Sequence, residues 1–147
     1  MSEVRARRTG LLIGGSVVVV ALIGLWLSRH LGWTDGPGKL VLPYPDDYIW
    51  AKHFSFNPLL AVLTLVIGLL TVVGFAAEVA AARRVAIGCS AVLAVAINVD
   101  LSTNDQVLGG RGGNVALMLM VAVGLLTLEL TPLEGEQERV TTSLKGH

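Results

Sequence analysis

The sequence predicts an all-α integral membrane protein: four transmembrane helices in a compact bundle, with both termini in the cytoplasm. Hydrophobic residues make up 53% of the 147 residues and charged residues only 15%, whereas an ordinary soluble domain has about 25% charged residues. The charges gather at the termini and connections, which leaves long apolar runs between them. A bilayer requires this segregation, because backbone polar groups in lipid must be satisfied within each helix. Residues 1–147 are therefore expected to form a single membrane domain.

Four apolar segments have the length of roughly 17 to 25 residues that a bilayer requires. They are predicted as helices over 11–28, 59–82, 85–101 and 114–130, with an outer loop at 29–58 and a cytoplasmic tail at 131–147. The first contains no charged residue, and Pro58 precedes the second, where a first-turn proline is tolerated. Asp100 lies at the edge of the third segment.

Basic residues predict the orientation of these helices. Arg5, Arg7 and Arg8 precede the first helix, and Arg83 with Arg84 is expected to form the turn between the second and third. By the positive-inside rule both groups belong in the cytoplasm. The first apolar run lacks a small-residue cleavage pattern after it, so we expect this helix to be retained. Arginine outnumbers lysine, and Ala, Val, Leu and Gly dominate, which favours a GC-rich bacterial genome. With the four apolar segments, we therefore expect a multi-pass protein of the cell inner membrane.

Two acidic residues lie close to the expected inner ends of helices. Glu78 is about one turn before the end of the second helix, and Glu129 is near the end of the fourth. Arg83 and Arg84 are near enough to pair with either. We predict anchoring or ion pairs at the inner interface; the entrance to a proton relay is the alternative, since ionisable groups in membranes are often functional.

Small residues recur at spacings typical of helix contacts. Ala86, Ser90, Ala94 and Asn98 follow one another every four residues, which predicts one ridge. Gly10 and Gly14 have the Gly-x-x-x-Gly spacing that lets helices approach closely in lipid.

The tetrapeptide Gly-Leu-Leu-Thr occurs twice, at 68–71 and at 124–127. Its distance from the preceding asparagine differs by one residue between the copies, which favours chance over duplication. We expect each glycine to offer a close-approach surface and each threonine to bond its own helix backbone.

The outer loop holds six of the eight aromatic residues. They are Trp33, Tyr44, Tyr48, Trp50, Phe54 and Phe56. Tyrosine and tryptophan gather at membrane interfaces, and they also anchor protein contacts. The loop is therefore interpreted either as an aromatic belt or as a partner-binding surface.

The residues that bind cofactors or metals do not occur in suitable patterns. Haem in a helical bundle needs histidine or methionine on facing helices, but His30, His53 and His147 all lie outside the helix interiors. The stretch 101–113 alternates polar residues like a calcium loop, yet it has Asp105 and Arg111 where such a loop requires Gly and Glu. We expect no cofactor and no metal. Zero net charge also argues against nucleic acid as a partner.

These observations favour a non-catalytic accessory or assembly subunit of a larger inner-membrane complex, for which a respiratory or transport assembly is a natural host, surrounded by lipid and other integral membrane subunits. The alternative is a small homo-oligomeric channel or carrier, with Ser90, Asn98 and Asn114 as its polar pathway and Glu78 and Glu129 at its inner mouth. A membrane enzyme acting on a lipid or quinone near Asp46, Asp47 and His53 is a third hypothesis, weakened because no nucleophile accompanies these residues.

Overall fold

A computed structural model describes residues 3–35 and 54–131 of the chain, which form four α-helices and no strand. The helices are α1 (Glu3–Ser28), α3 (Pro58–Ala76), α4 (Ala80–Leu101) and α5 (Gly112–Leu130). Each is long and apolar enough to cross a membrane. The prediction of an all-helical chain with four potential membrane spans is therefore confirmed for the described residues.

Three helix boundaries differ from the sequence-based prediction by five residues or more: the start of α1, the end of α3, and the start of α4, which is Ala80 rather than residue 85. Helix α1 begins at Glu3 rather than at residue 11, because the charged residues of this stretch are good helix formers and no proline interrupts it. Helix α3 ends at Ala76 rather than at residue 82, because Glu78 has a φ of 58°, a left-handed conformation that ends helices. The turn is therefore 77–79, and Arg83 and Arg84 lie on α4.

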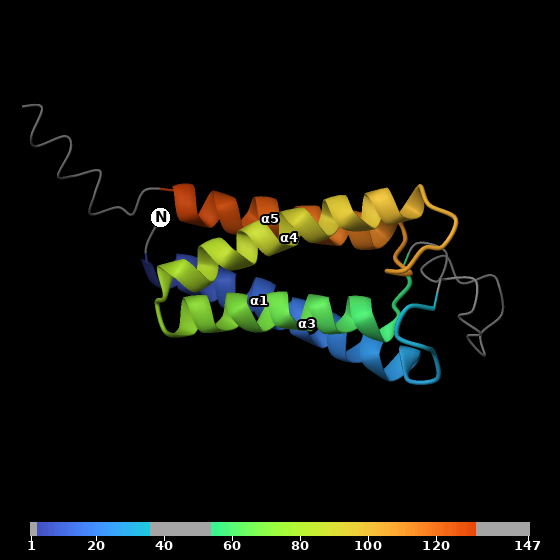
Figure 1. Ribbon diagram of the computed structural model, residues 1–147. Helices are drawn as coiled ribbons and strands as arrows, with labels where there is room; N and C mark the ends of the chain where they lie inside the picture. Colours follow the sequence, from blue (N-terminus) through green and yellow to red (C-terminus); the bar gives the residue numbers. More distant parts are fainter. Residues whose placement is uncertain (1–2, 36–53, 132–147) are drawn as a thin grey trace, which may run out of the picture.

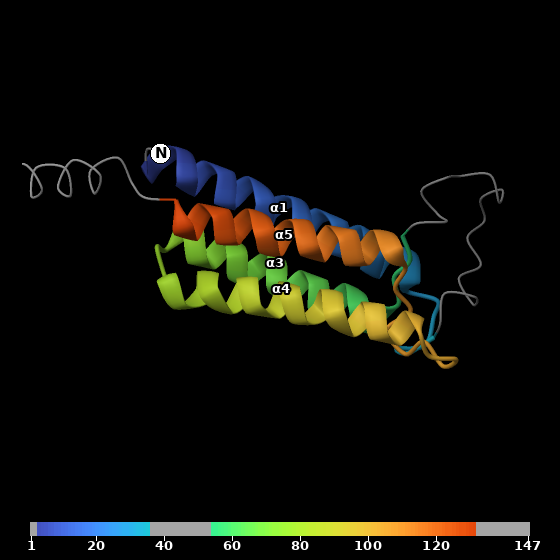
Figure 2. The same ribbon diagram turned by 90° about the horizontal axis from the view of Figure 1, so that it is seen from above.

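The four helices lie side by side, and each runs antiparallel to the next along the chain (Figures 1 and 2). Helix α1 packs most extensively on α3, and α4 packs on α5. Contacts between α3 and α4 join these two pairs, whereas α1 and α5 touch very little. The core between the helices is formed by large apolar side chains from all four: Val17, Leu60, Ile67, Phe75, Leu93, Ile97, Met118, Val121 and Leu125.

Glycines bring α1 and α3 into close contact. Gly10 lies against the Phe75 ring, and a Cβ at Gly14 would lie 3.0 Å from Thr71 Cβ. On the opposite helix, a Cβ at Gly68 would lie 2.9 Å from the backbone nitrogen of Val18. The Gly-x-x-x-Gly pair thus contacts α3 of the same chain, where close backbone approach favours packing in lipid.

The predicted ridge on α4 divides between two faces. Ala86, Ser90 and Ala94 are buried, and Ser90 Oγ donates to the Ala86 carbonyl at 2.7 Å. Asn98 is exposed, and Ile97 is buried in its place. The reason is geometric: four-residue steps overshoot the 3.6-residue turn by about 40° each, so a fourth member rotates off the buried face.

The two Gly-Leu-Leu-Thr copies have different surroundings. Thr71 is buried and bonds the Ile67 carbonyl, whereas Thr127 is exposed and bonds the Val123 carbonyl. The expected threonine bonds to the helix backbone are present in both copies. The different burial agrees with chance repetition rather than a duplicated packing unit.

Candidate functional site: the two ends of the helices and an apolar groove

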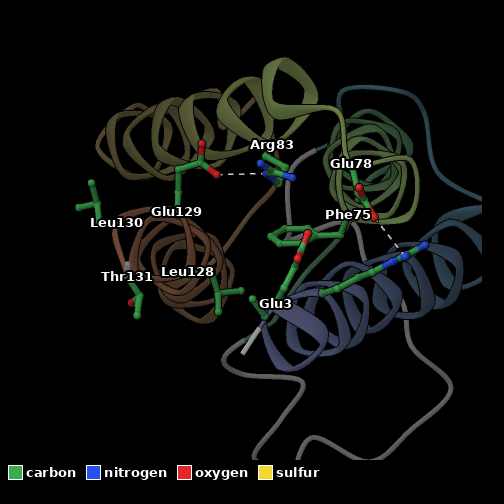
Figure 3. A pocket seen from close by; sticks show the side chains of 10 residues that line it. Glu3, Phe75, Glu78, Arg83, Leu128, Glu129, Leu130 and Thr131 are labelled. Carbon is green, nitrogen blue, oxygen red and sulfur yellow. Dashed lines mark hydrogen bonds and ion pairs between the residues drawn. The ribbon is translucent and has the colours of Figure 1, made fainter. Parts of the chain in front are cut away.

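Polar side chains gather at the two ends of the helices. We call the end that holds Arg7, Arg83 and Arg84 the arginine end, which is on the left in Figure 1, and the opposite end, with Asn57 and Asn114, the asparagine end. A pocket of about 340 Å³ opens at the arginine end between α1, α3, α5 and the start of α4 (Figure 3). Its lining consists of Glu3, Ala6, Arg7, Phe75, Glu78, Arg83, Leu128, Glu129, Leu130 and Thr131.

One ion-pair group at this end joins α4 to α5. Arg83 Nε lies 3.1 Å from Glu129 Oε2, and Arg84 Nε lies 3.3 Å from Glu129 Oε1. The Arg83 and Glu129 side chains are only 23% and 20% exposed, so water screens their attraction less than it would on an open surface. The Arg83 guanidinium also lies 5.4 Å from the centre of the Phe75 ring, within the range of a cation–π contact.

A second ion pair joins α1 to the turn after α3. Arg7 Nη1 lies 3.2 Å from Glu78 Oε1, and Arg7 Nη2 donates to the Ala76 carbonyl at 2.8 Å. The sequence predicted Arg83 or Arg84 as the partner of Glu78; the structure corrects this to Arg7. This pair could not be predicted, because the two residues are 71 positions apart in the sequence and Arg7 was expected to precede the first helix.

Arg7 and Arg83 also bind backbone carbonyls at the end of α3. Arg83 Nη1 donates to the Gly74 carbonyl at 3.5 Å, close to the Ala76 carbonyl that Arg7 binds. Helix C-termini carry unpaired carbonyl groups and a partial negative charge. Arginines from α1 and α4 therefore converge on the α3 end and stabilise it.

At the asparagine end, one buried amide joins three parts of the chain. Asn57 is 1% exposed. Its Oδ1 accepts from the Leu60 backbone N–H at 2.8 Å and so caps α3, while Nδ2 donates to the carbonyls of Val107 at 2.8 Å and Asp35 at 3.3 Å. These bonds join the connection between α1 and α3 to the connection between α4 and α5.

A second amide repeats this arrangement at the start of α5. Asn114 is 2% exposed, and its Oδ1 accepts from the backbone N–H groups of Arg111 at 2.9 Å and Ser55 at 3.1 Å. The sequence suggested Asn114 as part of a polar pathway; in the structure its side chain holds two backbone segments together. Asn114 is the third residue of α5, and its side chain accepts from the backbone of the N-cap Arg111, as in a capping box. An asparagine at the start of an apolar run was the available sequence signal, but its distant partner Ser55 was not visible in the sequence.

The aromatic residues proposed for partner binding are described only in part. Trp33 is 64% exposed and Phe54 is 37% exposed. Phe56 instead packs against Gly24 of α1. Tyr44, Tyr48 and Trp50 lie outside the described residues, as do Asp46, Asp47 and His53 of the enzyme hypothesis.

An apolar groove of about 560 Å³ runs between α3 and α4. It is lined by Leu63, Val66, Ile67, Val85, Gly88, Cys89, Val92, Leu93, Ala96 and Leu108. A Cβ added at Gly88 would meet no heavy atom within 4 Å, so the groove is open at this position. Val92 beside it is 69% exposed.

Within residues 3–35 and 54–131, no group of three His, Cys, Asp or Glu side chains is placed to hold a metal ion. Comparisons with protein-family models, curated proteins and solved structures found no match to the chain.

Proposed function

We propose that this protein is a non-catalytic accessory or assembly subunit of a larger membrane complex, which packs against another integral membrane subunit through the α3–α4 groove. The groove carries this proposal. Its lining is apolar and includes the small residues Gly88, Cys89 and Ala96. In lipid, helices associate through close packing at small residues rather than through hydrophobicity, so such a groove suits a helix of a neighbouring subunit.

The arginine end is proposed to face the cytoplasm of a bacterial inner membrane. Arg5, Arg7 and Arg8 on α1 lie at the same end of the helices as Arg83 and Arg84 on α4 (Figure 1). The positive-inside rule favours this end as cytoplasmic. Helix α1 begins and α5 ends there, so both termini of the described bundle would face the cytoplasm.

Site-specific photo-crosslinking in native membranes tests the groove. A photoreactive amino acid at Val92 should give one discrete adduct with an integral membrane protein, identified by mass spectrometry. The matched control is Val123 at the middle of α5, which is also apolar and 60% exposed but lies outside the groove lining. It should give no such adduct.

A filled groove provides the specificity control. Gly88→Leu places a side chain where the structure has open space, so folding should be retained while the Val92 adduct disappears. Equal adducts from Val92 and Val123, or an adduct that survives Gly88→Leu, would contradict the proposal.

The homo-oligomeric channel or carrier receives less support from the structure. Ser90 is buried and bonds its own helix, Asn98 is exposed off the buried face of α4, and Asn114 binds backbone at the asparagine end. These three side chains do not line one path. A Val92 adduct of twice the chain's mass would nevertheless favour self-association over a different subunit.

A further inference from the structure

The pocket at the arginine end lies where the four potential membrane spans end. In a bilayer that these helices cross, this position corresponds to the depth of the lipid headgroups. It lies between the ends of α1 and α5, two helices that touch very little. Charged side chains and apolar ones, among them Ala6, Phe75 and Leu128, line it together. A ligand that fits this lining must itself be part polar and part apolar.

The arginines provide donors for an anionic group. Arg7 contacts Glu78 and the Ala76 carbonyl through one N–H on each terminal nitrogen, and Arg83 uses Nε and Nη1 for Glu129 and the Gly74 carbonyl. A guanidinium has five N–H donors. Each arginine therefore retains N–H groups beside the pocket beyond its contacts with the described residues, and arginine N–H groups match phosphate oxygens well.

The carboxylates require a positive group in the same ligand. Three of them (Glu3, Glu78 and Glu129) line the pocket with two guanidiniums, so a purely anionic ligand would meet an excess of negative charge. Glu78 and Glu129 are paired with arginines. Glu3 extends from the first turn of α1 into the opening (Figure 3), and its carboxylate has no hydrogen-bond or ion-pair partner within residues 3–35 and 54–131.

We propose that this pocket binds the headgroup of a zwitterionic phospholipid that carries a phosphate and a primary ammonium, as phosphatidylethanolamine does. The phosphate binds the free N–H groups of Arg7 and Arg83, and the ammonium binds Glu3. The apolar residues of the lining contact the glycerol and upper acyl segments. This assignment uses the opposite side of the helices from the α3–α4 groove and does not depend on the proposed subunit function.

Lipid titration of the purified full-length chain, read by native mass spectrometry, tests the site. Phosphatidylethanolamine, phosphatidylcholine and phosphatidylglycerol with identical acyl chains are compared. Phosphatidylethanolamine should bind about threefold more tightly than phosphatidylcholine, whose trimethylated ammonium cannot donate to Glu3; this is the range of an interfacial ion pair. Equal binding of these two, or tighter binding of phosphatidylglycerol, would overturn the proposal.

Two variants separate the site from general charge effects. Glu3→Gln should abolish the preference for phosphatidylethanolamine while the melting temperature stays unchanged, because Glu3 is exposed. Asp105→Asn removes the same charge from an exposed residue at the asparagine end and should leave the preference intact. A preference that persists in Glu3→Gln would contradict the assignment.

Competition distinguishes a lipid headgroup from a free anion. Soluble phosphoethanolamine should displace bound phosphatidylethanolamine, and inorganic phosphate at the same concentration should not. Displacement by both to the same degree would assign the pocket to a simple anion and overturn the lipid proposal.

Discussion

The two ends of this molecule join the same helices with different chemistry. At the asparagine end, Asn57 and Asn114 are almost fully buried and bind backbone groups of neighbouring connections. At the arginine end, the pair of Arg7 with Glu78 is about half exposed, and only the pair of Arg83 with Glu129 is mostly covered. When a buried amide side chain is removed, the backbone groups that it bound lose their hydrogen bonds. When an exposed ion pair is broken, its charged groups bind water instead. We therefore expect stability to depend mainly on the asparagine end.

This difference follows from the length of the side chains. Arginine has a long side chain that reaches across helix ends while its charged group stays near water. It can therefore connect α1, α3 and α5 although their ends are separated by a pocket. Asparagine is short, so it holds only segments that already lie against each other. At the asparagine end the amides join adjacent backbone segments directly, and the arginine end is the one with room for a ligand.

The largest expected effect is at Asn57. Asn57→Ala removes the cap of α3 and leaves the Leu60 N–H and Val107 carbonyl without their partner, which should destabilise the fold by about 2–3 kcal/mol. Unfolding of the purified protein by a denaturing detergent measures this. Asn104→Ala, at an exposed position of the same end, is the control and should change stability little. A loss below about 0.5 kcal/mol for Asn57→Ala would refute the predicted dependence on this end.

An intermediate effect is expected at Glu129, which joins α5 to two arginines. Glu129→Gln leaves Arg83 partly buried without its charge partner and should cost about 1 kcal/mol. The same unfolding assay at low and high salt measures it. Salt should reduce the difference between wild type and Glu129→Gln but not that between wild type and Asn57→Ala; identical salt responses would show that the two ends do not differ in this way.

The smallest effect is expected at Glu78, where two contributions oppose each other. Its pair with Arg7 is exposed, so losing it costs little, and its φ of 58° is unfavourable for any residue with a Cβ. Glu78→Gly should therefore leave stability within about 0.5 kcal/mol of wild type. Glu78→Ala, which loses the pair but keeps the strain, should be less stable than Glu78→Gly by up to about 1 kcal/mol. The reverse order in melting temperature would contradict the backbone explanation.

The sequence predicted which charged residues lie at the arginine end better than it predicted their ion-pair partners. Glu129, Arg83 and Arg84 were expected near one another, and the structure places them within ion-pair distance. Arg7 was missed as the partner of Glu78, because a helix that starts at Glu3 cannot be distinguished by hydropathy from one that starts at the first apolar residue. The left-handed conformation of Glu78 was equally hidden, since glutamate gives no sign of it.

The apolar runs by themselves determined the four membrane-length helices, because a chain in lipid has few other ways to satisfy its backbone. Only the tertiary structure decided which faces meet. It placed Gly10 and Gly14 against α3, moved Asn98 off the buried face of α4, and left the groove at Gly88 open. Helices in a membrane protein contact one another through faces on which small residues allow close packing. The spacing of small residues in the sequence is compatible with more than one partner helix, so only the arrangement of the helices in space shows which faces meet.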